Sequence, residues 1–84
     1  MQDHAHSAIA RRLKRANGHL ETIIAMVEQG RPCGQIAQQL QAVEKALVNA
    51  KRELIHDHIE HCLDGGADSA KSVQDLKALA KFLS

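Results

Sequence analysis

Aromatic residues and proline are nearly absent from this chain. Phe82 is its only aromatic side chain and Pro32 its only proline among 84 residues. Because β-sandwiches rely on β-branched and aromatic residues to pack their sheets, this composition argues against an all-β fold. Aliphatic residues and alanine must therefore provide the core, which favours closely packed helices. A chain this short buries a limited core, so we also expect it to gain stability by oligomerising.

Long apolar runs are absent too. No segment approaches the roughly 20 apolar residues that span a bilayer. The opening Met-Gln-Asp-His-Ala-His has neither the basic nor the apolar region of a signal peptide. We therefore expect a cytoplasmic protein with no membrane partner. In that reducing compartment its two cysteines, Cys33 and Cys62, are more often metal ligands or redox-active thiols than a structural disulfide.

The net charge is only +1, but the basic residues are clustered. Clustering matters more than total charge for a nucleic-acid footprint. The basic residues that we expect to face DNA phosphates are Arg11, Arg12, Lys14, Arg15, Lys51 and Arg52. A basic face that is merely solvated is the alternative explanation.

Apolar residues at three- and four-residue steps predict three helices, over residues 7–29, 32–63 and 69–83. The predicted fold class is therefore all-α, a three-helix protomer with a long central helix. Residues 1–6 are expected to form a short tail that contains histidines, and residues 7–84 a single domain.

Residues that start or stop helices mark the boundaries. Ser7 is a candidate N-cap for the first helix. Gly30 suits the C′ position that ends this helix, and Pro32 suits the first turn of the next one. Gly65-Gly66 separates the second helix from the third.

The second helix carries a heptad pattern. Its apolar positions follow steps of 4, 3, 4, 3 and 4 residues, at Ile36, Leu40, Val43, Leu47, Ala50 and Leu54. This spacing is typical of a seam that packs against other helices. We expect all six residues to pack, and the seam to require a helical partner.

Potential metal ligands lie at both ends of this seam. Cys33 precedes Ile36 by three residues, while His58 and Cys62 follow Leu54 at four-residue steps. His58 and Cys62 are i and i+4 on one helix, so they share a face and can bind one metal ion. Cys33 is 25 residues from His58. That is about 37 Å along a helix, so the three residues cannot meet within one chain.

An antiparallel partner would bring the three residues together. If two copies of this helix cross with the dyad near Leu47, Cys33 of one chain meets His58 and Cys62 of the other. Two equivalent sites follow from the twofold symmetry. A redox switch that joins Cys33 to Cys62 across the same interface is the main alternative, but it leaves His58 without a role.

With these residues in place, the chain resembles the CsoR/RcnR-type metal-sensing transcriptional repressors over nearly its whole length. The spacing of Cys33, His58 and Cys62 is that of the family's Cys-His-Cys ligand set. The other matching segments are Arg12-Leu13-Lys14-Arg15, Gly18-His19-Leu20, Ala42-Val43 and His56-Asp57-His58-Ile59-Glu60-His61-Cys62. The start of the chain and the Arg-Ala-Asn-Gly-His stretch are most similar to the DmeR-like branch.

The resemblance implies a three-helix protomer that assembles into a dimer of dimers, a homotetramer. It implies a repressor, not an enzyme, that binds operator DNA through basic surfaces and has no small-molecule substrate. Metal binding would weaken DNA affinity and release an efflux or resistance gene from repression. Arg12 and Lys14 correspond to basic positions implicated in DNA contact, and Arg52 is a basic neighbour on the second helix.

The metal is predicted less directly. Copper sensors of this type often have a tyrosine before the first cysteine and a glutamate on the third helix, where this chain has Pro32 and Gln74. Nickel- and cobalt-responsive members draw a further ligand from the N-terminal segment, where this chain has His4 and His6. Two sulfur and two nitrogen donors suit Ni(II) or Co(II), which we expect, with Cu(I) the alternative and Zn(II) possible. His61 is another candidate ligand.

Two rival functions use the same residues. One is a thiol- or formaldehyde-responsive repressor, and the other is a cytosolic metal-binding protein without a DNA function. Catalysis is not expected, because beyond the metal ligands the sequence has no nucleophile with a base and an orienting group, and no phosphate loop.

Overall fold

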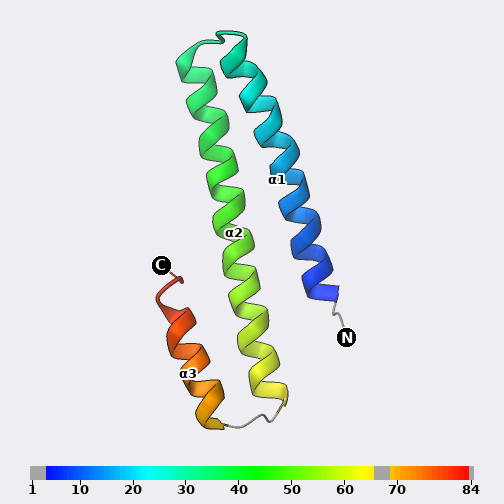
Figure 1. Ribbon diagram of the computed structural model, residues 1–84, viewed down its shortest axis with the longest axis vertical. Coiled ribbons are helices and arrows are strands. Elements are labelled where there is room, and N and C mark those ends of the chain that lie inside the picture. Colours follow the sequence, from blue (N-terminus) through cyan, green and yellow to red (C-terminus); the bar gives the residue numbers. More distant parts are fainter. Residues whose placement is uncertain (1–3, 66–68, 84) are drawn as a thin grey trace. The chain divides into compact units, whose positions relative to one another are not determined.

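The computed structural model describes the backbone of residues 4–65 and 69–83, with the side chains of residues 6–61 and 73–83. Its elements are the helices α1 (His4–Glu28), α2 (Cys33–Gly65) and α3 (Ser69–Ala80) (Figure 1). No strand occurs in these described ranges. The predicted all-α protomer with a long central helix is therefore confirmed. None of the described helices has the length and apolarity needed to cross a membrane.

Two helix ends differ from the predictions by three residues, and the other ends by no more than two. α1 begins at His4 rather than at Ser7, so Ser7 lies inside the helix and residues 4–6 are not part of a tail. Alanine has the highest helix propensity, and Ala5 in His-Ala-His extends the helix by a turn. α3 ends at Ala80 rather than Leu83, because the chain closes in i to i+3 bonds from Phe82 N to Leu79 O (2.9 Å) and from Leu83 N to Ala80 O (3.1 Å).

The turn between α1 and α2 has the predicted chemistry. Gly30 adopts a φ of 70°, a left-handed conformation that glycine reaches without strain. Its N–H donates to the carbonyl of Val27 (3.1 Å), and Arg31 N–H donates to the carbonyl of Met26 (3.0 Å), which is the Schellman arrangement. Pro32 directly precedes α2, where its lack of an N–H removes no helical hydrogen bond, and its carbonyl accepts from Gln35 N–H at 3.0 Å.

The described chain forms two compact units, Met1–Ala50 and Lys51–Ser84, which divide within α2. In the first unit, α1 runs antiparallel to residues 33–50 of α2, and Figure 1 shows the short turn that joins them. In the second unit, residues 51–65 of α2 precede α3. Ile55 is buried there with 2% exposure, and Leu76 and Leu79 of α3 are half-buried.

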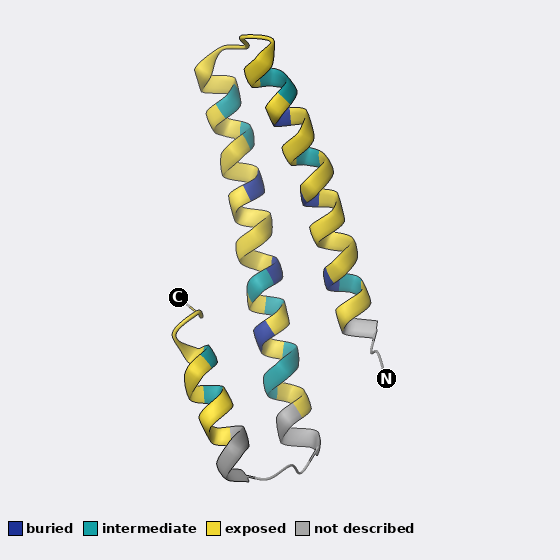
Figure 2. Cartoon of the chain, in the orientation of Figure 1, coloured by how far each residue is buried: buried dark blue, intermediate teal, exposed yellow. Residues whose placement is uncertain are grey.

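The core of the first unit is narrow. Each helix contributes buried residues seven positions apart, which are Ile9, Ala16 and Ile23 from α1 and Val43 and Ala50 from α2 (Figure 2). Positions seven apart lie at nearly the same angle around a helix, so the two helices meet along one line of side chains each.

Only part of the predicted seam packs within the chain, which corrects the expectation that all six residues would do so. Val43 and Ala50 are buried and Ile36 is half-buried, but the alternate positions Leu40, Leu47 and Leu54 stay exposed at 43%, 46% and 44%. On α1, Leu13 and Leu20 are exposed at 44% and 39% in the same way. One neighbouring helix covers only one edge of an apolar stripe, so a second edge remains uncovered.

The uncovered leucines of the first unit line two neighbouring hollows, which together we call the leucine groove. The larger part, about 530 Å³, is lined by Leu20, Leu40, Val43 and Leu47 with Ala37, Gln41 and Glu44. A smaller part of about 150 Å³ adds Leu13, Ala16 and Asn17. Leu20, Val43 and Leu47 line both parts, so the groove follows the α1–α2 contact.

Candidate metal centre and nucleic-acid interface

Cys33 is the first residue of α2, and it is an exposed, free thiol. Cys33 is exposed because it lies directly after the turn at Gly30 and before the first residue of the seam. A thiol at a helix start is accessible to a metal ion or to another protein chain. The structure therefore places this predicted ligand where a partner can reach it.

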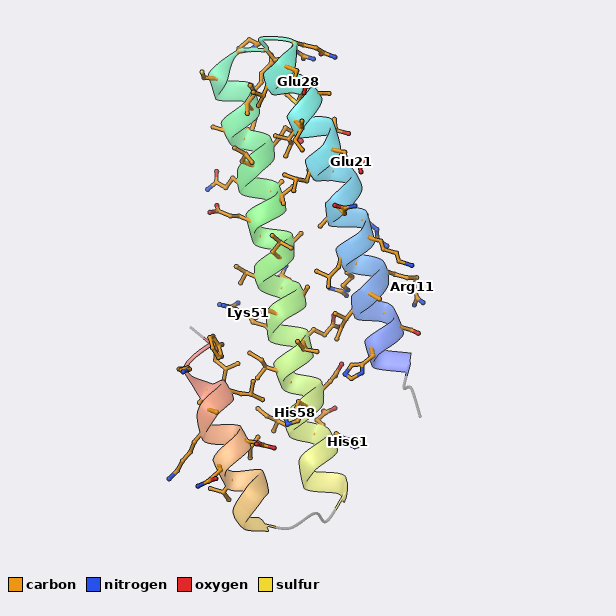
Figure 3. The ribbon with its side chains drawn as sticks, in the orientation of Figure 1. Arg11, Glu21, Glu28, Lys51, His58 and His61 are labelled. Atoms are coloured by element: carbon orange, nitrogen blue, oxygen red, sulfur yellow. The ribbon has the colours of Figure 1, made fainter. Side chains whose placement is uncertain are left out.

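The other two predicted sulfur and nitrogen ligands lie near the far end of α2. His58 is half-buried, and Cys62 follows four residues later on the same helix (Figure 3). The i, i+4 spacing puts the two positions on one helix face. The side chain of Cys62 lies outside the described residues. His61, the other candidate, is exposed.

One continuous helix separates Cys33 from His58. Both residues belong to α2, with Cys33 in the first unit and His58 in the second. That Cys33 and His58 share a metal ion only between two chains stays a prediction from the helical rise.

The two N-terminal histidines belong to α1. His4 is the first residue of that helix, but its side chain lies outside the described residues. His6 is exposed in the first two turns. The two positions are i and i+2, which do not face each other on a helix. At most one of them can therefore point toward a given metal site while this turn stays helical.

The described side chains contain a different group of potential ligands, His56, Asp57 and Glu60, whose ligand atoms lie within 4.8 Å of one another. His56 Nδ1 and Glu60 Oε2 are 3.9 Å apart, and both side chains are well exposed. The sequence argument missed this group, although the i, i+4 spacing of His56 and Glu60 could have indicated it. Exposed groups of this kind are common on helices without a metal ion.

Two of the predicted DNA-contacting residues line a hollow of the first unit. Arg12 and Arg15 line a polar hollow between α1 and α2, whose other lining residues are Ala16, His19, Ala46 and Asn49. Lys14 is exposed but does not line it. Arg11 lies on the side of α1 away from α2, as Figure 3 shows. In the second unit, Lys51 is half-buried and Arg52 is exposed.

A hydrogen bond crosses between the helices beside this hollow. Nε2 of His19 lies 2.6 Å from Oε1 of Gln39, and both side chains are half-buried. With an amide oxygen as its partner, Nε2 is the donor, so the bond sets the position of the imidazole against α2. His19 lies in the matched Gly18-His19-Leu20 segment, but no role for it, for Gln39 or for Asn49 could be predicted from the sequence, because their proximity depends on the register of the two helices.

The protomer is all-helical, has thiol and imidazole donors toward the two ends of its central helix, and has a basic hollow beside its first helix. These features are those of the class of small helical metal sensors. The chain is a member of the metal-sensitive transcriptional repressor family, whose model matches residues 5–84. This family consists of transcriptional repressors, not enzymes.

Two curated relatives are named copper-sensing transcriptional repressor CsoR. The protein from Mycobacterium ulcerans (strain Agy99) is 39% identical over 80 residues, covering 89% of this chain and 67% of the relative. The protein from Bacillus subtilis (strain 168) is 39% identical over 75 residues, covering 89% of this chain and 71% of the relative. The chain thus spans about two thirds of the length of the mycobacterial relatives it matches.

A solved structure has the same fold. It is titled the nickel-responsive transcriptional regulator InrS, and it superposes with a TM-score of 0.73 at 31% identity, covering 92% of this chain and 86% of that one. The sequence resemblance to this family is therefore confirmed. The family also bears out a transcriptional repressor that responds to metal.

Proposed function

We propose that this protein is a repressor that holds operator DNA in its metal-free form and releases it when Cys33 of one protomer and His58 and Cys62 of another hold a metal ion. The observation that carries the proposal is the arrangement of α2. Donors lie at both ends of one unbroken helix, and the leucines between them remain uncovered. A second copy of α2 would cover these leucines and complete the metal site at once.

The donor set fits a soft transition-metal ion. Two thiolates and one imidazole suit Cu(I), which accepts few ligands. The curated relatives named above are copper sensors. Cu(I) is therefore favoured over the Ni(II) or Co(II) that we expected from the sequence. Ni(II) or Co(II) is the second candidate, because the structural neighbour is nickel-responsive and His4, His6 or His61 could add a nitrogen donor.

Coupling between metal and DNA would act through the helices of the chain itself. Bound between two copies of α2, a metal ion supplies coordinate bonds that favour one arrangement of the protomers. α1 carries Arg12 and Arg15, and it packs on α2 through Ala16 and Val43, so α1 follows changes in α2. By linkage, metal needs only to bind the DNA-incompetent arrangement more tightly, and a coupling of about 1–3 kcal/mol is typical.

DNA release is the test of this proposal. We would follow the fluorescence anisotropy of a labelled duplex from the region upstream of the protein's own gene, and add Cu(I), Ni(II), Co(II) or Zn(II) to the complex. Wild-type protein is expected to release the duplex with one of these ions, by about 5- to 150-fold in affinity. Cys33→Ala and His58→Ala proteins should bind the duplex and keep it when metal is added.

Release from the Cys33→Ala protein would contradict the proposed site. If metal binds but never changes DNA affinity, the protein is a cytosolic metal-binding protein. If persulfide or formaldehyde releases the duplex while metal does not, and mass spectrometry shows Cys33 modified, the protein is a thiol- or formaldehyde-responsive repressor. Absorption spectra taken alongside separate thiolate-bound Ni(II) or Co(II), which absorb visible light, from Cu(I), which does not.

A further inference from the structure

The polar hollow between α1 and α2 has the composition of an oxyanion site. It has a volume of about 340 Å³ and is lined by Arg12, Arg15, Ala16, His19, Ala46 and Asn49, a set we call the arginine hollow. This described lining contains no carboxylate. The leucine groove, by contrast, is apolar and includes Glu44. The two hollows therefore differ in chemistry, and only the arginine hollow suits an anion.

The local sequence explains why this space is open and basic. Arg12, Arg15 and His19 follow each other at three- and four-residue steps, so they share one side of α1. Ala46 and Asn49 are three residues apart on α2. Alanines at positions 16 and 46 have no side chain long enough to fill the gap between the helices. Longer polar side chains surround a space that the alanines leave open.

The donors in the hollow match a phosphate group. A guanidinium offers a planar fork of N–H groups that binds phosphate oxygens in pairs. The Asn49 amide adds an uncharged donor from the second helix. The Nε2–H of His19 is already donated to Gln39 at 2.6 Å, so the ring is a wall of the hollow that is held in place before any ligand arrives. A site whose walls are fixed in advance loses less entropy on binding.

We propose that the arginine hollow binds a single phosphate group, and that in the repressor complex this group is a phosphodiester of the operator backbone. This inference rests on the proposed function and adds to it. It assigns Asn49, which carries no formal charge, to DNA binding, and His19 to holding one wall of the hollow in place. It also distinguishes Arg15, which lines the hollow, from the equally charged Lys14 one residue away, which does not.

Matched pairs of variants test the hollow. Asn49→Asp places a carboxylate in it, and Gln38→Glu makes the same change of charge at an exposed position of α2 that lines none of the described hollows. Arg15→Gln and Lys45→Gln each remove one positive charge, and Lys45 is an exposed residue of α2 that lines none of the described hollows. Unchanged helical content by circular dichroism confirms that each variant is folded. The probe is the labelled duplex from upstream of the gene, measured at several salt concentrations without metal.

Asn49→Asp and Arg15→Gln are expected to weaken duplex binding about tenfold or more, as loss of a charge-assisted hydrogen bond does. Arg15→Gln should also lower the slope of log affinity against log salt by about one. Gln38→Glu and Lys45→Gln should have less than a third of these effects on affinity. If both variants of a pair lose the same duplex affinity, the proposal about the hollow is overturned. The proposed function would still stand in that case, because the wild-type protein binds the duplex.

Inorganic phosphate separates the two proposals when DNA binding is absent. In ¹H–¹⁵N spectra of the wild-type protein, phosphate should shift the side-chain amide of Asn49 and the backbone amide of His19 and leave Gln38 unchanged. If wild-type protein fails to bind the duplex but shows these shifts, the hollow is a free-phosphate site and the operator assignment is wrong. If it binds neither duplex nor phosphate, both the hollow and the proposed function are wrong.

Discussion

Replacing Leu47 with alanine tests whether a second chain covers the leucine groove. Leu47 is 46% exposed in the protomer and lines both parts of the groove. It also lies at the centre of the seam, where the predicted dyad would bring its own copy close. Shortening this side chain should therefore change the stability of one folded chain little and weaken the association of two chains more.

The size of the effect follows from the area that a partner would cover. Complete burial of a leucine contributes about 1.5–3 kcal/mol, so covering the exposed half of Leu47 contributes about 1 kcal/mol. In a twofold dimer both chains lose this burial free energy, so the dimer loses about 2 kcal/mol. That corresponds to a dimer dissociation constant about 30-fold higher. A cavity left by the substitution would add to this value.

Sedimentation velocity over a range of concentrations measures that constant. Val48→Ala is the control, because Val48 is similarly exposed at 39% but lines neither part of the groove. The reasoning predicts a much larger shift for Leu47→Ala than for Val48→Ala. It would be refuted if wild-type protein stayed monomeric at all concentrations, or if the two variants shifted the constant equally.

Three further experiments test the fold and the site. Gly30→Ala should destabilise the protein by about 1–2 kcal/mol in urea unfolding, because an alanine at a φ of 70° is strained although the space around it is open. Gly18→Ala should stabilise it by about 0.5–1 kcal/mol in the same assay, because Gly18 lies inside α1 and an added Cβ would meet open space. If both substitutions change the free energy of unfolding in the same direction, this explanation is wrong. A double-mutant cycle on His19→Ala and Gln39→Ala should show a coupling of about 0.5–1.5 kcal/mol, and additive effects would mean that their 2.6 Å contact does not contribute to stability.

Much of the fold could be predicted from local chemistry. Gly30 and Pro32 act through their own backbone, so the turn between the first two helices followed from residue types alone. The start of α1 did not, because Ser7 is a good cap in isolation, whereas the helix begins at His4 and includes Ala5, a residue of high helix propensity.

It was harder to predict which residues of the seam pack within the chain and which stay exposed. A heptad pattern shows that a stripe is apolar, but it does not show how many neighbours cover it. Val43 and Leu47 look alike in sequence, yet α1 buries the first and leaves the second exposed. The candidate ligands on α2 could be found from spacing because a helix has a fixed rise. The arginine hollow could not, since it depends on the register that sets His19 beside Gln39.

The central claim is that two chains build each metal site, and mixed dimers test it most directly. Cys33→Ala protein and Cys62→Ala protein are each expected to lack a complete site. When the two are mixed, Cys33 of one chain can join His58 and Cys62 of the other, which restores one site in each mixed dimer. Random exchange then predicts about a quarter of the wild-type metal stoichiometry, read from thiolate-to-metal absorption with Co(II). If the mixture binds no more metal than the separate variants, the site is not shared between chains and the account is wrong.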